Sequence, residues 1–406
     1  MFYDAYQAQQ DFLTPFRAAA SLASTALGDT LAGPAANYWL RCAAAGAEIF
    51  SRAQMIHDRP AYDIAPVRVA GRLCEIREEV ALDLPFGRLV HFAKDRDAAS
   101  QPRVLLAAPM AGHFATLLRN TVQTMLADHD VYITDWKSAR DVPLAEGRFG
   151  TDEYIDHLMA FLGHIGEGVH AVAVCQPCPS ILATTALMAE DGHPATPRSL
   201  TLMAGPVDTR INPTRVNEMA NEHPLDWFEQ NLITSVPRRY AGAFRHVYPG
   251  FLQLSAFMTM NIARHVRAHM DLFGHILKGE MEKADANRRF YDEYFSVADL
   301  AAEFYLETVQ KVFQEHHLGR GIYTYRNRLV DPSAIRKIGL LTVEGERDDI
   351  CGLGQTMAAQ DLCVNIKPFR KKHYVQAGVG HYGVFSGSRW KNQIYPMVKN
   401  TILAAE

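Results

Sequence analysis

An alternation of buried strands and helices constrains the fold of this chain more than any other feature of its sequence. The stretch 103–109, RVLLAAP, is a continuous apolar run, which is typical of a strand covered on both faces. Further strand-like runs at 130–136, 169–175 and 199–206 are separated by helical stretches. Repeated strands and helices at this spacing predict βαβ units, and therefore an α/β fold with a mostly parallel central sheet.

Other kinds of sequence flank and interrupt this alternation. Residues 1–60 have helical periodicity, which fits either a packing helix or attachment to an apolar surface. Residues 66–94 alternate apolar and polar residues like half-exposed strands, whereas 207–334 are helical and aromatic, with no convincing strand. Strands resume at 338–345 and 371–378. We therefore expect an N-terminal helical segment (1–60), a core (61–206 and 335–406) and a helical cap or lid (207–334) inserted before the last two strands.

Composition excludes several classes of function. The chain has 406 residues, of which 48% are hydrophobic and 21% are charged, enough to bury a large core. The formal charge is −4, and the longest basic run is RKK at 370–372, so we expect no nucleic-acid partner. No apolar run approaches the ~20 residues that a transmembrane helix needs.

The start of the chain and its cysteines favour the cytoplasm. The first residues, MFYDAYQAQQDFLTPF, lack a basic segment followed by an apolar one, so we expect no export signal. The six cysteines are sparse and show no regular framework of disulfides, which favours a reducing compartment. A cytoplasmic enzyme is therefore the simplest expectation.

The string HAVAVCQPCPSILA (170–183) places Cys175 where a strand ends and a helix begins. Cys175 and Cys178 form a Cys-x-x-Cys pair, which can be a thioredoxin-like redox site. Such a site belongs near an early strand of a compact domain, but this motif lies in the middle of a long alternating sheet. We therefore favour Cys175 as a nucleophile, and we interpret Cys178 and Ser180 as packing residues of the following helix.

The strand-to-helix position of Cys175 is that of a nucleophile elbow, the sharp turn that carries the nucleophile of α/β-hydrolases. This motif is usually Gly-x-Ser-x-Gly, with small residues on either side because the turn is tight. Ala173 supplies a small residue before Cys175, but Pro177 stands in the place of the second glycine. Proline is tolerated in the first turn of a helix, so the helix can still begin there.

The partners of such a nucleophile follow on the loops after later strands, first an acid and then a histidine. Asp348 and Asp349 follow the strand that ends near Gly345, and His381 follows the last strand. We prefer Asp348 as the acid because of its G-x-x-D spacing. The oxyanion hole is expected from the N–H of Gln176 and from that of Met110 or Ala111. His113, in the same loop as Met110, could begin a helix, contact substrate or support the loop.

With these residues in place, the sequence resembles the intracellular poly(3-hydroxybutyrate) depolymerases, which are α/β-hydrolases with a cysteine nucleophile. The resemblance runs from about residue 60 to the end and rests on APMAGHFATLLRNTV, DHDVYITDW, VAVCQPCPSILA, VEGERDDICGLGQT and GVGHYGVFSGSRW. The family's Cys-Asp-His triad carries over onto Cys175, Asp348 and His381. The 207–334 insertion matches only in general character, so no substrate contact can be transferred to it.

The resemblance implies hydrolysis of poly(3-hydroxybutyrate) or its oligomers through a thioester, with release of hydroxyacids. It implies no cofactor and no metal, and it implies a cytoplasmic location at polyester granules, either as a monomer or as a homodimer. Two alternatives stay open. A polyester synthase-like acyltransferase also uses cysteine on this fold, although its elbow normally keeps the glycine that Pro177 replaces. The second alternative is a protein that binds polyester granules and has no catalytic activity.

Three further motifs are interpreted as coincidences. GVGHYG (378–383) has the form G-x-G-x-x-G but follows the last strand, so no nucleotide fold can be completed. HVRAH (265–269) lacks the glutamate of a zinc-protease helix and any obvious third ligand. The pair His316 and His317 is expected at a solvated helix end.

Overall fold

The computed structural model describes residues 2–30, 38–95, 101–260 and 262–406, and its centre is an eight-stranded sheet. The strand order is β15-β14-β8-β7-β5-β6-β4-β3. Strands β3 and β4 run antiparallel to their neighbours, and all other neighbouring pairs are parallel. The strands are β3 (Ile76–Asp83), β4 (Gly87–Lys94), β5 (Arg103–Ala107), β6 (Asp130–Trp136), β7 (His170–Val174), β8 (Ser199–Met203), β14 (Gly339–Gly345) and β15 (Lys371–Gln376).

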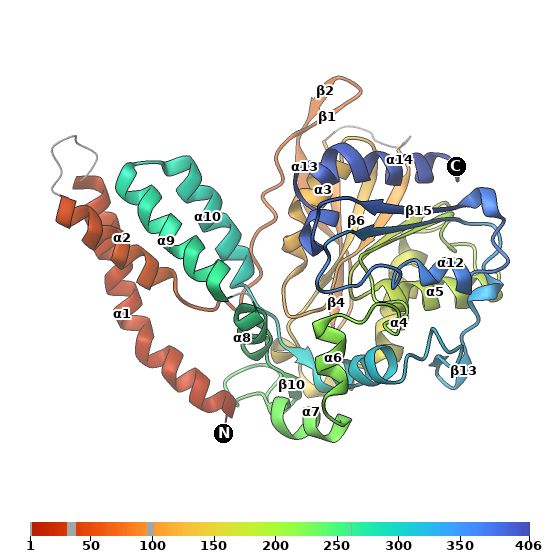
Figure 1. Cartoon of the computed structure of the whole chain (residues 1–406), viewed down its shortest axis with the longest axis horizontal. Helices are drawn as coiled ribbons and strands as arrows, with labels where there is room; N and C mark the ends of the chain where they lie inside the picture. The colour runs from red at the N-terminus through yellow and green to blue at the C-terminus, as the bar shows by residue number, and fades with distance from the viewer. Residues whose placement is uncertain (1, 31–37, 96–100, 261) are drawn as a thin grey trace.

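Helices cover both faces of this sheet (Figure 1). Successive residues of one strand point to opposite faces, so Leu105 of β5 joins one hydrophobic core and Leu106 joins the other. Burial on both faces explains why the central strands are continuous apolar runs. The flanking helices are α3 (Arg119–Met125), α4 (Thr151–Ile165), α5 (Cys178–Glu190), α12 (Ala358–Leu362), α13 (Gly387–Arg389) and α14 (Tyr395–Leu403). The fold is that of the α/β-hydrolases, as predicted.

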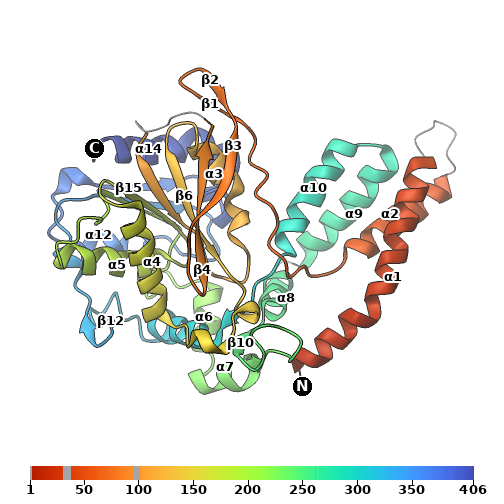
Figure 2. The ribbon, with the colours of Figure 1, turned by 180° about the vertical axis from the view of Figure 1, so that it is seen from behind.

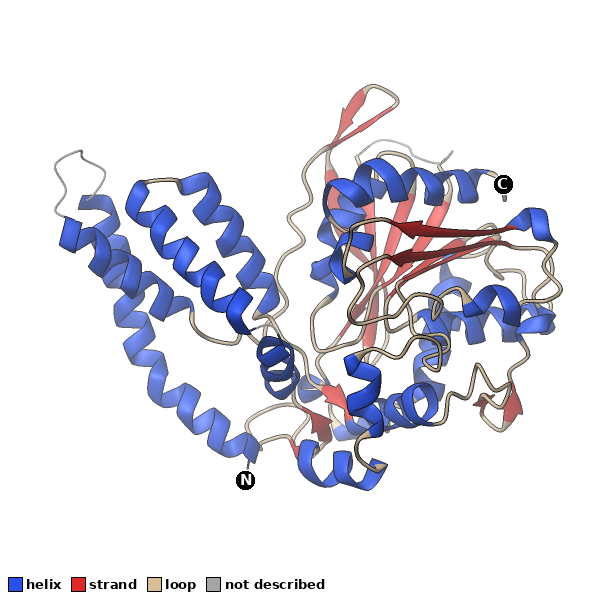
Figure 3. Cartoon of the chain, in the orientation of Figure 1, coloured by secondary structure: helices blue, strands red, loops and turns tan. Residues whose placement is uncertain are grey.

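The segment between β8 and β14 contains helices and also short strands, which corrects the expectation that it has no strand (Figure 3). Strands β9, β10 and β11 form a small antiparallel sheet, and β12 pairs with β13. Each is only two or three residues long, too short for an alternating pattern to show in the sequence. The elements are α6 (Arg215–Asn221), α7 (Leu225–Leu232), β9 (Thr234–Ser235), β10 (His246–Tyr248), α8 (Gly250–Met260), α9 (Ile262–Lys278), α10 (Met281–Tyr294), β11 (Leu300–Ala301), α11 (Ala302–Thr308), β12 (Thr324–Tyr325) and β13 (Arg328–Leu329).

Two hairpins of helices form an arm beside the sheet (Figure 2). Helices α1 (Phe2–Thr30) and α2 (Tyr38–Arg52) pack together, and α2 packs on α9, which packs on α10. The start of α1 is held to the core by Tyr3, whose buried hydroxyl donates to Asp299 at 2.7 Å. A separate hairpin of β1 (Val67–Val69) and β2 (Arg72–Cys74) precedes β3. Because the arm joins 1–60 to part of 207–334, the division into segment, core and cap is retained only as a proposal.

Candidate active site

Cys175 lies at the turn between β7 and α5 with a backbone φ of +65°. This left-handed conformation is costly for a residue with a side chain, and such strain concentrates at functional sites. The turn is held on both sides: the Cys175 N–H donates to the carbonyl of Met203 at 2.8 Å, and the Cys175 carbonyl accepts from the N–H of Cys178 at 3.1 Å. The thiol of Cys175 is partly exposed.

Gly205, just beyond β8, lies against the turn that carries Cys175. A methyl group at Gly205 would lie 2.2 Å from the Cβ and Sγ atoms of Cys178 and 2.9 Å from the carbonyl oxygen of Cys175. Cys178 is wholly buried, and burial raises the pKa of its thiol. No local pattern in the sequence pointed to Gly205, because its contact is with a residue 27 positions earlier.

His381 and Asp348 meet on the loops that follow β15 and β14. His381 Nδ1 lies 2.8 Å from Asp348 Oδ2. The other carboxylate oxygen of Asp348 accepts from the N–H groups of Ile350 and Cys351, both at 2.9 Å. Asp349, the other acid considered, is exposed. Both carboxylate oxygens of Asp348 are hydrogen-bonded, so this carboxylate is held in one orientation.

Cys175 also acts on the ionisation of His381, so the structure brings the three residues of the predicted triad into one region. Burial by itself would lower the pKa of His381, but its interactions with Cys175 and with the carboxylate of Asp348 raise it well above its ordinary value. The raised pKa makes the His381 imidazole a stronger base, which suits a group that takes a proton from a neighbouring thiol.

The loop that carries Asp348 is fixed by Glu344, a buried residue of β14. Its carboxylate accepts from the N–H groups of Gly354 at 2.9 Å, Thr356 at 2.8 Å and Met357 at 3.0 Å. The Thr356 hydroxyl in turn bonds both the N–H and the carbonyl of Gly205, at 2.8 and 3.0 Å. These bonds connect the acid loop to the strand end behind Cys175. The sequence contained no signal for them beyond an acid inside an apolar strand.

The residues expected to form the oxyanion hole all line the cavity that contains Cys175, but one of their N–H groups already donates a hydrogen bond. The Met110 N–H donates at 3.0 Å to the side-chain oxygen of Gln176. The N–H groups of Gln176 and Ala111 have no hydrogen-bond acceptor among the described residues. The carbonyl of Ala111 accepts from the side-chain amide of Gln253 on α8, a second residue that the sequence analysis missed. Helix α8 thus holds the loop that follows β5.

The histidines outside the triad have structural partners. His113 bonds the carbonyl of Tyr294 at 3.2 Å, and burial lowers its pKa to about 4, so it supports the loop after β5. His265 bonds the Tyr291 hydroxyl at 3.0 Å, and His269 bonds the carbonyl of His265.

The pair at 316–317 is not a solvated helix end, which corrects that expectation: both rings are partly buried and bonded, to Thr209 and Glu315 respectively. No group of three His, Cys, Asp or Glu side chains in the described part of the chain is arranged to hold a metal ion.

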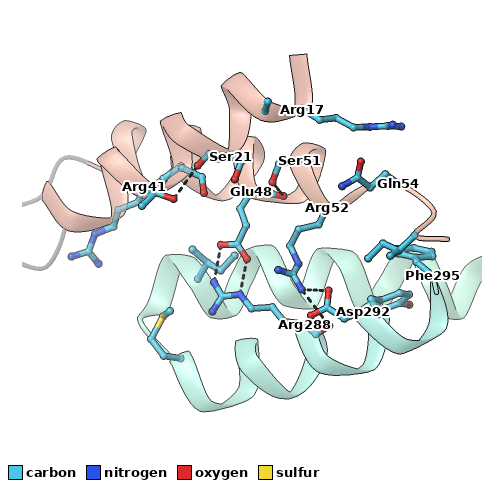
Figure 4. A pocket seen from close by; sticks show the side chains of 18 of the residues that line it. Arg17, Ser21, Arg41, Glu48, Ser51, Arg52, Gln54, Arg288, Asp292 and Phe295 are labelled. Carbon is cyan, nitrogen blue, oxygen red and sulfur yellow. Dashed lines mark hydrogen bonds and ion pairs between the residues drawn. The ribbon is translucent and has the colours of Figure 1, made fainter. Parts of the chain in front are cut away.

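Two cavities contain residues of the site, and another lies elsewhere, in the arm. One of about 430 Å³ is lined mainly by apolar side chains of the cap and contains Cys175, Gln176, Met110 and Ala111. A second, of about 600 Å³, contains His381. A third, of about 1240 Å³, lies between the hairpins of the arm and contains none of these residues. Figure 4 shows how Glu48 of α2 meets Arg288 of α10 there.

A model of one protein family matches the second half of the chain. Residues 204–406 match the family model described as "PHB de-polymerase C-terminus", which covers half of the chain. No curated protein matches the chain. None of the described helices is long and apolar enough to cross a membrane.

Solved structures of several hydrolases are similar in architecture. Epoxide hydrolase from Bacillus megaterium has 13% identity, with 80% of this chain and 99% of that chain covered and a TM-score of 0.47. 2-Hydroxy-6-oxo-6-phenylhexa-2,4-dienoate hydrolase from Rhodococcus sp. strain RHA1 has 14% identity, with 81% of this chain and 99% of that chain covered and a TM-score of 0.42. Monoacylglycerol lipase from Paleococcus ferrophilus has 11% identity, with 75% of this chain and 95% of that chain covered and a TM-score of 0.43. Similarity of this degree says nothing about the substrate of this chain.

Proposed function

The chain belongs to the family described as PHB de-polymerase C-terminus, and from this premise we propose that it hydrolyses ester bonds of poly(3-hydroxybutyrate)-type polyesters with Cys175, His381 and Asp348. One observation carries the proposal. The strained turn at Cys175, the hydrogen-bonded pair of His381 and Asp348, and an apolar cavity converge on one point. Perturbed ionisable groups at a concave apolar site are the usual mark of an active site.

In the first half of the proposed reaction, His381 takes the thiol proton and the sulfur attacks an ester carbonyl carbon. The negative charge on the carbonyl oxygen is held by the N–H of Gln176 together with that of Ala111, or with that of Met110 once the Gln176 side chain has moved away. The carbon–oxygen bond of the ester then breaks. His381 gives its proton to the departing alcohol oxygen, and the acyl group stays on Cys175 as a thioester.

In the second half, His381 takes a proton from water, and the resulting hydroxide attacks the thioester carbonyl. The carbon–sulfur bond breaks, the acyl part leaves as a carboxylic acid, and the sulfur regains its proton. Asp348 holds the imidazole through Nδ1 and stabilises its charged form in both halves. The apolar cavity suits the methyl and methylene groups of a polyester, since its lining offers few polar groups.

The test is release of hydroxyacid from amorphous poly(3-hydroxybutyrate) by the wild type, Cys175→Ala and Cys178→Ala. We expect Cys175→Ala to lose activity by at least about 1000-fold. Cys178→Ala is the matched control: it removes the buried neighbouring thiol, and it should keep activity within about threefold. Equal rates for the wild type and Cys175→Ala would remove Cys175 from the chemistry.

A second incubation, with hydroxyacyl-CoA, separates hydrolysis from polymer synthesis. The proposal predicts no chain growth. Release of CoA with chain growth, and without soluble hydroxyacid, would instead identify an acyltransferase.

We propose further that the arm attaches the protein to the polymer surface of granules. Helices α1 and α2 expose large apolar side chains, among them Phe12 at 68%, Phe16 at 53% and Trp39 at 75%. Exposed apolar residues gathered on one element mark interaction sites. Phe12→Ser with Trp39→Ser should reduce binding to amorphous granules while hydrolysis of a soluble hydroxybutyrate trimer stays unchanged. Unchanged granule binding would exclude this role for the arm.

A further inference from the structure

Two cavities of different character meet at Cys175 and His381. Cys175 lies in the apolar cavity of about 430 Å³, and His381 lies in the cavity of about 600 Å³. Val216, Met219 and Ile350 line both, so the two spaces adjoin. An extended substrate therefore has room on each side of the reacting pair.

The chemistry decides which part of an ester lies in which cavity, and this step rests on the proposed function. The acyl part stays bonded to Cys175, whereas the alcohol part leaves with a proton from His381. Every unit of a polyhydroxyacid has a hydroxyl at one end and a carboxyl at the other. The part that leaves as an alcohol therefore contains the carboxyl end of the chain, and it leaves through the cavity at His381.

The charged residues differ between the two cavities. The lining of the apolar cavity includes no Arg or Lys. The lining of the cavity at His381 includes Arg215, Arg264 and Asp349. His265 also lines it, but burial lowers its pKa, so this ring is neutral near pH 7.

Arg215 already bonds the carboxylate of Glu222 at 2.6 Å. Arg264, by contrast, has no ion pair or hydrogen bond with any residue that the structure describes, and its side chain is exposed. Arg264 lines the same cavity as His381. Burial raises the pKa of Tyr382, the neighbour of His381, and the positive charge of Arg264 acts in the opposite direction on the same phenol. An available guanidinium thus faces the space through which the carboxyl end leaves.

We propose that Arg264 binds the free carboxylate at the end of a short polyester chain, so that the protein removes hydroxyacid units from the carboxyl end. A guanidinium matches a carboxylate with two parallel hydrogen bonds. The carboxylate of Asp349 lies in the same cavity and opposes this binding, which keeps the affinity for the released acid low. Arg264 is then a residue that determines specificity, at a position the reaction itself does not require.

The experiment compares the linear trimer of 3-hydroxybutyrate, as its free carboxylate, with the methyl ester of the same trimer. The wild type should have a kcat/KM about tenfold higher for the carboxylate. Arg264→Gln should abolish this preference by lowering kcat/KM for the carboxylate alone. Arg264→Lys should restore part of it. Arg267→Gln is the matched control, because Arg267 is exposed on the same helix and lines neither cavity.

Three outcomes would overturn the inference. If the wild type hydrolyses the two trimers equally well, no carboxylate is recognised. If Arg264→Gln lowers hydrolysis of the acid and the methyl ester by the same factor, Arg264 has a structural role only. If the wild type releases hydroxyacid from amorphous polymer but hydrolyses neither trimer, this inference fails and the proposed function stands. No release from polymer or from either trimer would overturn both.

Discussion

His381 Nδ1 and Asp348 Oδ2 lie 2.8 Å apart, with only 5% of the histidine side chain and 1% of the aspartate side chain exposed. The N–H groups of Ile350 and Cys351 donate to the other carboxylate oxygen of Asp348 and fix its orientation.

Asp348→Asn keeps the size of the side chain but cannot stabilise a charged imidazole. We expect kcat to fall by about 100- to 10,000-fold, with the folded structure retained by circular dichroism. Asp349→Asn is the control, and on the methyl ester of the trimer, which has no free carboxylate, it should change kcat by less than about threefold. A large loss of kcat in Asp349→Asn, with little loss in Asp348→Asn, would show that Asp349 and not Asp348 is the acid of the triad.

The backbone strain at Cys175 predicts a reversed order of stability for two inactive variants. Alanine normally stabilises a folded chain relative to glycine, but at a φ of +65° glycine is the unstrained residue. Cys175→Gly should therefore unfold in urea with a free energy about 1 kcal/mol higher than Cys175→Ala. At Ala183, inside α5, the ordinary order should hold, and Ala183→Gly should lose about 1 kcal/mol or more. If Cys175→Ala proves the more stable of the two inactive variants, the strain is not real.

The contact between Gly205 and Cys178 predicts a coupled pair of substitutions. Gly205→Ala would place a methyl group 2.2 Å from the Cys178 side chain, and we expect a loss of about 2–3 kcal/mol of unfolding free energy, with a lower kcat. Adding Cys178→Gly removes the 2.2 Å contact and leaves only the 2.9 Å contact with the Cys175 carbonyl oxygen, so the double variant should be more stable than the sum of the single effects. Gly163→Ala, in α4 with open space around it, should instead be neutral or stabilising. Additive losses would show that the two residues do not collide.

Buried neutral histidines predict how stability depends on pH. Burial lowers the pKa of His113 and of His129 to about 4, from 6.5 in the unfolded chain. Between these values the unfolded state binds protons that the folded state does not. The unfolding free energy therefore falls as the pH drops from about 6.5 to about 4, by on the order of 3 kcal/mol for each histidine.

Buried carboxyl groups with raised pKa values, among them Asp135, act in the opposite direction over part of this range. Burial raises the pKa of Asp135 to about 6, so its protonation favours the folded state as the pH falls. The contribution of one histidine is isolated by comparing urea unfolding of the wild type and His129→Gln at several pH values. His129→Gln should show a smaller loss on acidification, and identical slopes would mean that His129 is not held neutral.

Sequence patterns predicted much of the fold because its central strands are buried on both faces. A strand such as β7 has no solvated side, so it reads as an uninterrupted apolar run. The order of strands and helices then implied a parallel sheet, and the loops after β14 and β15 were identified as the places for Asp348 and His381. The short strands β9 to β13 left no pattern, because two or three residues cannot show alternation.

The sequence by itself determined the α/β order, the family and the few residues worth testing as a site, since each depends on local pattern or on matching strings. Only the tertiary structure decided which groups meet. It placed Gly205 against Cys178, and it brought Asp348 rather than Asp349 to His381. It also bonded Met110 to Gln176 and placed Arg264 in the lining of the cavity that contains His381. Each of these contacts joins residues at least 27 positions apart in the chain, and contacts of that kind follow from packing rather than from local periodicity.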